Sequence, residues 1–363
     1  MNKALIAYFI SYHGFGHASR AAAVMAALAR VRPGVRFELF TDCPQWIFAD
    51  SLPDRFGYHA VRADIGMVQR SPLEEDPAAT GRALNAWRPW DPRWIDDLIA
   101  TVGRLGCGLV ICDISALGVA VAQGARLPCV LIENFTWDFI YEPYLDAVPD
   151  LKAHALFFNR TYAQVNLRIQ TEPLCRPVDG AVRVAPIARA ARTRPEEIRR
   201  RLKIPADARM VLVSMGGIPD QFQFLARLPA DVDPYIVIPG ADNMVSPHPK
   251  VILLPTHSSY FHPDLLRAAD LLIGKAGYST IAEAYHTGTP FGYIARPQSP
   301  ESPALERFIQ AHLSACPVSV QAYNDGQWLT RLPELLQLPR SRPPEENGAD
   351  TVARLLSESY LTQ

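Results

Sequence analysis

Residues 4–30 read ALIAYFISYHGFGHASRAAAVMAALAR: an apolar run, a turn with two glycines and two histidines, and an alanine-rich segment. The run Ala4–Ile10 has the composition of a buried strand, and Ala18–Ala29 has that of a helix. A short glycine-containing turn between a strand and a helix is typical of the first crossover unit of a Rossmann-like domain. This stretch therefore predicts a parallel sheet with a ligand-binding edge near Ser11–Arg20.

Short apolar runs alternate with helical patterns along the rest of the chain. In the first half, the expected elements are Phe37–Phe40, Leu109–Cys112, Ala116–Ala125 and Cys129–Ile132. The second half contains a further series of expected strands: Met210–Ser214, Tyr235–Ile238, Val251–Leu254, Leu271–Ile273 and Phe291–Ile294. Strands separated by helices predict parallel sheets with crossover connections.

The fold class is therefore α/β, with two Rossmann-like domains that we expect to face each other across a cleft. The first would span residues 1–185 and the second residues 186–345, with a proline- and arginine-rich linker at the boundary. A helical tail at 346–363 could pack back on the first domain. Residues Asp64–Arg93 are long for a connection, and they suggest either a mobile functional loop or a surface excursion anchored by tryptophans.

Bulk composition excludes several functional classes. The chain of 363 residues has a formal net charge of −1, so it has no global basic field for nucleic acid. The six cysteines form no CxxC pair, which indicates reduced thiols in a cytoplasmic protein rather than a zinc site. No apolar stretch is long enough to span a membrane, and no signal peptide is recognisable. A peripheral membrane contact stays open, and the composition does not indicate an oligomeric state.

The first loop can be interpreted in two ways. Gly14, Gly16 and Ser19 form G-x-G-x-x-S, close to a dinucleotide-binding fingerprint, and Asp42 lies where a ribose-binding acid of an NAD-dependent oxidoreductase would be. Two histidines, His13 and His17, have no part in clasping a pyrophosphate. A histidine beside a helix N-terminus can take a proton from a hydroxyl nucleophile, whereas capping or packing is the structural alternative.

A second signal follows the expected strand Leu271–Ile273. Gly274-Lys275-Ala276-Gly277 leads into a helix that begins near Tyr278–Thr280, and the free amides of a helix N-terminus form an anion site. Lys275 would either contact phosphate or be an exposed loop lysine. Glu283 would either close a capping box on Thr280 or accept the hydroxyls of a nucleotide ribose.

These motifs carry a resemblance to a known family. The block Ala268–Arg307, together with SMGG at Ser214–Gly217, resembles the donor domain of GT-B glycosyltransferases related to the peptidoglycan-lipid N-acetylglucosaminyltransferase. HGFGHASR resembles the glycine-rich first loop of the same enzymes. The segment Ile111–Tyr141 is also similar to the glycosyltransferase-like half of plant arabinokinases.

The resemblance implies a site for a nucleoside-diphosphate sugar, with a UDP-sugar favoured. Residues implied to hold the diphosphate are Gly216, Gly217, Gly277, Tyr278, Ser279 and Thr280. Glu283 would bind the ribose, Pro255 would lie beside the nucleotide base, and Glu301 would contact sugar hydroxyls. Gly14 and Gly16 remain candidate ligand-binding glycines of the first loop. Pro303-Ala304 stand where relatives have a glutamine pair, so the transferred sugar is left open.

On the acceptor side, strand-end carboxylates accompany His17 as candidate acids or bases. Asp113 ends one expected strand, and Glu133, followed by Asn134, ends the next. Either carboxylate could instead cap the following helix. His257 and His262 flank the expected base-binding region and are expected to pack or to orient the loop rather than to react.

The sequence thus predicts a glycosyltransferase of the hexosyl or N-acetylhexosaminyl class, which the resemblance implies is inverting and independent of a metal ion. The alternatives are a nucleotide-sugar 2-epimerase of the same fold and a non-catalytic nucleotide-sugar-binding module. We expect no kinase domain to accompany this chain, and we therefore expect it to act alone or in trans. The acceptor is unknown; Trp87 and Trp90 in the long connection are the expected place where it docks.

Overall fold

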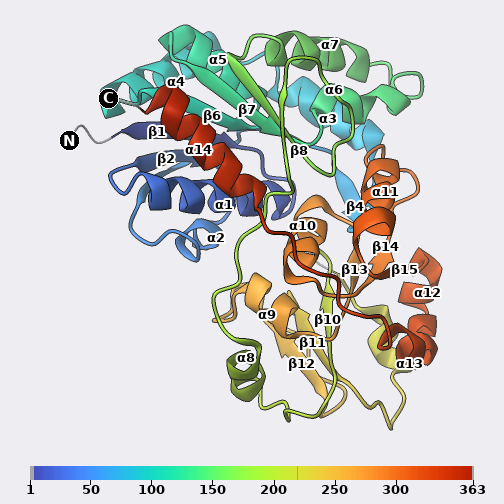
Figure 1. Ribbon diagram of the computed structural model, residues 1–363. Coiled ribbons are helices and arrows are strands. Elements are labelled where there is room, and N and C mark those ends of the chain that lie inside the picture. Colours follow the sequence, from blue (N-terminus) through green and yellow to red (C-terminus); the bar gives the residue numbers. More distant parts are fainter. Residues whose placement is uncertain (1–3, 219, 362–363) are drawn as a thin grey trace. The chain divides into compact units, whose positions relative to one another are not determined.

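The computed structural model describes residues 4–218 and 220–361, which divide into two units. Among the described residues, the first unit comprises 4–68, 75–188 and 346–361, and the second comprises 69–74 and 189–345. Each unit is built around one parallel sheet (Figure 1). The outer ends of the expected first domain and tail, residues 1–3 and 362–363, lie outside the described residues.

The first unit contains a seven-stranded sheet in the order β3-β2-β1-β6-β7-β8-β9. Its strands are β1 (Leu5–Ile10), β2 (Arg36–Thr41), β3 (Phe56–Ala60), β6 (Leu109–Asp113), β7 (Cys129–Glu133), β8 (Leu167–Thr171) and β9 (Val182–Val184). The helices are α1 (Gly16–Val31), α2 (Trp46–Ala49), α3 (Pro77–Trp87), α4 (Pro92–Leu105), α5 (Ala116–Ala125), α6 (Trp137–Tyr141), α7 (Leu151–Tyr162) and α14 (Gly348–Tyr360). The chain order reverses between β1 and β6, which makes their carboxyl ends the switch point of the sheet.

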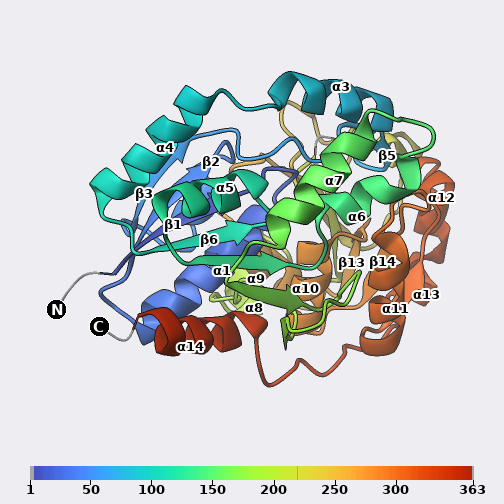
Figure 2. The ribbon, with the colours of Figure 1, turned by 90° about the horizontal axis from the view of Figure 1, so that it is seen from above.

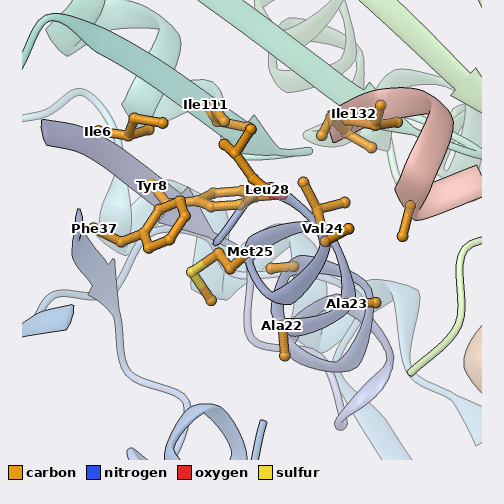
Figure 3. Close-up of a cluster of buried hydrophobic side chains, with 14 of the residues drawn as sticks. Ile6, Tyr8, Ala22, Ala23, Val24, Met25, Leu28, Phe37, Ile111 and Ile132 are labelled. Carbon is orange, nitrogen blue, oxygen red and sulfur yellow. The ribbon is translucent and has the colours of Figure 1, made fainter. Parts of the chain in front are cut away.

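Helices cover both faces of this sheet. On one face, α1 and α14 lie side by side (Figures 1 and 2). Figure 3 shows Val24 and Leu28 of α1 packed against strand residues such as Tyr8 and Ile132. The opposite face is covered by α4, α5, α6 and α7. Because both faces are covered, the central strands are apolar in continuous runs, which is the pattern that made them recognisable in the sequence.

The second unit contains a six-stranded parallel sheet in the order β12-β11-β10-β13-β14-β15. Its strands are β10 (Met210–Ser214), β11 (Tyr235–Pro239), β12 (Val251–Leu254), β13 (Leu271–Lys275), β14 (Phe291–Ile294) and β15 (Ala315–Pro317). One face packs against α8 (Pro195–Arg201), α9 (His262–Ala268), α10 (Tyr278–Thr287) and α11 (Ser302–His312). The other face packs against α12 (Val320–Asn324) and α13 (Leu332–Leu335). Here the chain order reverses between β10 and β13.

The connection Asp64–Arg93 is more ordered than the sequence suggested. It contains a two-stranded sheet of β4 (Gln69–Ser71) and β5 (Glu74–Glu75), followed by α3. The Asp76 side chain accepts a hydrogen bond from the Ala79 amide, and Pro77 occupies the first turn, so α3 has a strong start signal. Of the two interpretations left open for this segment, the helix cap and the packing support the anchored surface excursion.

The tryptophans of this connection are used in packing. The Trp87 and Trp90 rings meet edge to face at a centroid separation of 5.2 Å, and Trp90 also packs on Phe157 of α7. The Arg88 guanidinium lies 3.4 Å from the Phe157 ring centroid. These contacts anchor the segment between α3 and α4. They agree with the interpretation of this connection as a surface excursion held by tryptophans.

Within the described part of the chain, no helix combines the length and apolar character that a bilayer crossing requires.

Candidate functional site

The switch points of both sheets carry the residues that the sequence singled out. In the first unit, the loop after β1 leads to His17, and Asp113 is the last residue of the neighbouring strand β6. In the second unit, Gly216 follows β10, and Lys275 ends the neighbouring strand β13. Ligands of open parallel sheets bind outside the carboxyl ends of strands at such points. Each unit therefore has one topologically expected site.

His17 and Asp113 are in direct contact. The Nδ1 atom of His17 lies 2.8 Å from Oδ1 of Asp113, and both residues are buried. If Nδ1 carries the proton that it donates to the carboxylate, Nε2 is left as a proton acceptor. This is the arrangement in which a carboxylate orients an imidazole for general-base chemistry.

Arg20 completes this cluster and was missed in the sequence analysis. Its Nε and one terminal nitrogen donate to the two Asp113 oxygens at 2.8 and 2.6 Å, and its other terminal nitrogen donates to Oδ1 of Asn134 at 2.6 Å. Arg20 stands three residues after His17, so both project from the same side of α1. That spacing was the one signal from which its role could have been inferred.

The charge state of Asp113 follows from these contacts. Burial favours its neutral form, but the Arg20 guanidinium and the hydrogen bonds from Arg20 and His17 outweigh burial and lower its pKa. The next residue, Ile114, has a φ of +46°, which a β-branched residue rarely adopts, and its carbonyl accepts a 2.7 Å hydrogen bond from the Tyr162 hydroxyl. Such strain is typical of backbone at functional sites.

Glu133 lies on the other face of the same sheet. Asp113 is the register partner of Ile132, so Glu133, one residue further along β7, points the opposite way. Its Oε1 accepts hydrogen bonds from Arg168 at 2.9 Å and Gln170 at 2.6 Å, both on β8. Burial raises the pKa of Glu133, although Arg168, Gln170 and the charge of Arg20 act to lower it. The structure thus brings His17 and Asp113 together and does not bring Glu133 to them.

The first loop is held by a buried carboxylic acid that the sequence did not suggest. Asp64 accepts hydrogen bonds from the Ser11 hydroxyl at 2.9 Å and from the Trp137 indole. Burial raises the pKa of Asp64 to about 7, although these hydrogen bonds oppose the shift. His13 lies edge-on to the Trp137 ring at a centroid separation of 5.7 Å. Within the loop, Gly14 has a φ of +67°, and Gly16 is the first residue of α1.

In the second unit, two glycine turns approach one lysine. A Cβ atom placed on Gly216 would lie 3.5 Å from Cε of Lys275, and one placed on Gly277 would lie 3.7 Å from it. Gly216 and Gly217 both have positive φ, which suits glycine. Lys275 is buried rather than an exposed loop residue, so the structural alternative for it is wrong. A cation therefore lies beside backbone that has no side chains to obstruct a ligand.

The N-terminus of α10 adds backbone amides to this cluster. The helix begins at Tyr278 with Gly277 as its N-cap, and the Ile281 amide donates to the Gly277 carbonyl at 3.0 Å, so the amides of the first turn precede this bond. Tyr278 and Thr280 are buried, whereas Ser279 is half-buried. These amides, the glycine turns and Lys275 together have the chemistry of an anion site.

Glu283 belongs to a buried polar chain. Its Oε1 accepts a hydrogen bond from Nε of Arg189 at 3.0 Å, and its Oε2 lies 2.7 Å from Nδ1 of His262. Burial opposes its ionisation, but Arg189 and His262 lower its pKa below the ordinary glutamate value. The capping-box alternative is wrong, because the helix starts two residues before Thr280 and Glu283 lies well inside it.

The remaining candidate residues are placed as follows. Glu301 precedes α11 and pairs with Arg296, and both are buried. Pro255 is exposed directly after β12. Asp42 follows β2 with Arg62 at 3.6 Å. In the part of the chain that the structure describes, no cluster of three or more His, Cys, Asp or Glu side chains is arranged to hold a metal ion.

Comparison with known proteins gives a distant relative in sequence. No protein-family model matches the chain. It is 24% identical over 363 residues to an L-arabinokinase of Arabidopsis thaliana, a match that covers 98% of this chain and 34% of the relative. The chain thus spans about a third of the length of that curated relative.

Solved structures give a clearer result for the fold. The chain superimposes on the spinosyn forosaminyltransferase SpnP with a TM-score of 0.60 and 13% identity, covering 99% of this chain and 94% of the other. A UDP-glucosyltransferase from Polygonum tinctorium gives 0.62 and 14%, with 99% of each chain covered. MurG from Acinetobacter baumannii gives 0.55 and 12%, with 98% and 99% covered.

All three neighbours are glycosyltransferases, and the resemblance drawn from the sequence motifs is confirmed at the level of architecture. The chain has the GT-B fold of these enzymes, with two Rossmann-like units.

Proposed function

We propose that the protein is a glycosyltransferase that moves a sugar from a nucleoside-diphosphate sugar, with a UDP-sugar as the favoured donor, to an acceptor hydroxyl. The observation that carries this proposal is the cluster at the second switch point. Lys275 lies beside Gly216 and Gly277, and the buried Glu283 lies on the helix that begins at Tyr278, so these groups would combine an anion site with a carboxylate. The glycosyltransferase fold supports the proposal, because in that fold a diphosphate and a ribose are the ligands such groups suit.

The donor site would act by stabilising charge on the leaving group. Lys275 and the amides of Tyr278–Thr280 would bind the diphosphate, and Gly216 and Gly217 would allow close approach of the backbone. As the bond from sugar C1 to the phosphate oxygen breaks, its electron pair leaves with the nucleoside diphosphate. Fixed donors aimed at that charge lower the barrier. These groups supply the positive charge themselves, so we propose that transfer does not need a divalent metal.

The first unit would supply the base. With Nδ1 donating to Asp113, Nε2 of His17 would take the proton of the acceptor hydroxyl while that oxygen attacks C1. Asp113 would orient His17 rather than react, because its oxygens are already engaged by His17 and Arg20. Direct attack of the acceptor from the side opposite the leaving group inverts the anomeric carbon. Glu133, held by β8 on the other face of the sheet, would have a structural role.

Calorimetry with a ligand panel tests the donor site. We expect one of UDP, GDP or dTDP, and its sugar conjugates, to bind wild-type protein, and Glu283→Ala to abolish binding with the fold intact. Glu334→Ala is a matched control in the same unit, because that carboxylate is exposed and pairs with Arg331 three residues away. Binding of NAD with no binding of any nucleotide sugar would overturn the proposal in favour of the oxidoreductase interpretation of Asp42.

A transfer assay with the same donor then tests the base. With the acceptor found by a hydroxyl-compound screen, His17→Gln should lower kcat by about 10²–10⁴, the usual contribution of a positioned acid or base, while donor binding is retained. Full activity after chelation with EDTA is expected. A His17→Gln variant that transfers at the wild-type rate would refute the role of His17.

A further inference from the structure

Four side chains in the second unit form a continuous hydrogen-bonded chain. Oγ of Ser214 lies 2.9 Å from Nε2 of His262, whose Nδ1 lies 2.7 Å from Glu283. Arg189 donates to the second Glu283 oxygen. The chain connects the end of β10, next to the glycine turn, with the carboxylate of α10. The proposed function uses Glu283 but leaves Ser214, His262 and Arg189 unexplained.

The proton positions at one end of this chain are defined. Glu283 is buried and ionised, with Arg189 on one oxygen, so its other oxygen can only accept a hydrogen bond. Nδ1 of His262 therefore carries a proton. Besides Glu283 and Arg189, the charged groups near His262 include Arg199 on α8, Asp264 and Arg267 on α9, and Arg192, whose guanidinium lies 4.2 Å from the ring centroid of the adjacent Phe261. Of these, Arg199 is bonded to Asp270 and the Ala268 carbonyl, and Asp264 accepts the amides of Arg192 and Thr193.

The other end of this hydrogen-bonded chain, at Ser214 and Nε2 of His262, has two possible arrangements of its protons. When His262 is neutral, Ser214 donates its hydroxyl proton to Nε2, and only oxygen lone pairs face outward. When His262 is protonated, Nε2 donates to Ser214, and the serine proton is free to be donated elsewhere. An anion near Ser214 repels the first arrangement and accepts a hydrogen bond from the second. Ser214 ends the strand that precedes Gly216 and Gly217, which is where the proposed diphosphate would be bound.

We propose that Ser214 and His262 form a proton-linked contact to the donor diphosphate, so that donor binding is accompanied by uptake of up to one proton from solvent at His262. This inference rests on the proposed donor site and adds two positioning residues to it. Glu283 and Arg189 keep the far nitrogen of His262 protonated, and Ser214 transmits the change at the near nitrogen to the ligand. The donor would therefore bind more tightly as the pH falls, by up to tenfold per pH unit.

The test is calorimetric titration with UDP-glucose in buffers of equal pH and different ionisation enthalpy, which measures protons taken up per ligand bound. A nucleotide sugar is suitable because neither of its phosphates titrates near neutral pH, so the uptake belongs to the protein. GDP-glucose and dTDP-glucose replace UDP-glucose if either binds more tightly. Wild-type protein is expected to take up a measurable fraction of one proton, and its affinity should fall as the pH rises.

Two variants distinguish a loss of the proton-linked contact, called the relay below, from a loss of the fold. His262→Gln can still bond to Ser214 but cannot titrate, and Ser214→Ala keeps His262 but removes the hydroxyl that would contact the ligand. Both should lose proton uptake, and His262→Gln should bind the donor with an affinity that no longer depends on pH. His248→Gln is the matched control, because His248 precedes the first residue of the edge strand β12, whereas Ser214 is the last residue of the central strand β10. It should retain the wild-type uptake.

The outcomes distinguish this inference from the proposed function. Donor binding without proton uptake in wild-type protein, or unchanged uptake in either His262→Gln or Ser214→Ala, overturns the relay and leaves the donor site in place. Failure of all three nucleotide sugars to bind wild-type protein overturns the proposed function and the relay together. Thermal unfolding of each variant identifies a loss of binding that is due to loss of the fold.

Discussion

Replacing Arg20 by methionine is the most informative test of the cluster around Asp113. Arg20 is 1% exposed and Asp113 is fully buried, and two hydrogen bonds join them at 2.8 and 2.6 Å. A third bond joins Arg20 to Asn134. Methionine keeps most of the volume of the side chain but removes the charge and all three donors.

The expected loss of stability is large because a buried carboxylate is left without its cation. Removing one partner of a buried ion pair typically costs about 3–5 kcal/mol, most of which is the cost of an uncompensated charge. Arg30→Met, on the same helix, is the matched control. Its ion pair with Asp350 has side chains 59% and 42% exposed, so its loss should cost at most about 1 kcal/mol.

Urea unfolding followed by tryptophan fluorescence measures this difference. The signal reports mainly on the first unit, which contains Trp46, Trp87, Trp90, Trp94 and Trp137, whereas the second contains Trp328. Arg20→Met should shift the midpoint several times further than Arg30→Met. Equal shifts for the two variants would refute the view that Arg20 compensates a buried charge.

The pH dependence of stability independently tests the direction in which the pKa of Asp113 is shifted. In the wild type the pKa of Asp113 is lowered, so its contribution is present above its unfolded value of about 4 and is lost as the pH falls. In Arg20→Met, burial becomes the main influence and raises that pKa, so the contribution of Asp113 is instead lost as the pH rises. The cost of the substitution should therefore be larger at pH 7 than at pH 4, and a cost that does not change with pH would contradict this reasoning.

Three further predictions concern other parts of the molecule. Asp64 has a pKa raised to about 7, above its unfolded value of about 4, so its contribution to stability is complete below pH 4 and is lost as the pH rises through 7. Asp64→Asn should remove this loss of stability, and urea midpoints between pH 4 and 8 measure it. Gly118→Ala should destabilise the protein by about 1–3 kcal/mol, because the added Cβ would lie 2.5 Å from Cβ of Phe9. Gly103→Ala, on an open helix face, should instead stabilise it by up to about 1 kcal/mol. Thermal unfolding that ranks the two variants the other way would contradict the packing. Lys275→Met should weaken UDP-glucose binding about 10- to 100-fold by calorimetry, since a buried charge-assisted hydrogen bond is lost, and unchanged affinity would exclude a phosphate contact.

Much of the architecture could be predicted because its signals are local. A strand buried on both faces reads as a continuous apolar run, and the runs beginning at Met210, Val251 and Phe291 match strands of the structure. The glycine turns at Gly14 and Gly216 were recognisable because positive φ favours glycine at any turn of that type. For residues 64–93 the sequence left two interpretations open, since the order of this segment depends on a helix cap and on aromatic packing against α7.

The sequence by itself determined the elements, the glycine turns and the identity of residues at strand ends, because each depends on neighbours a few positions away. The tertiary structure decided which of these residues meet. Arg20 finds Asp113 across 93 positions because β1 and β6 are adjacent, and His262 finds Glu283 because α9 packs on α10. It also placed Glu133 on the opposite face from Asp113, since side chains alternate along a strand and the register, not the spacing in sequence, determines which way each one points.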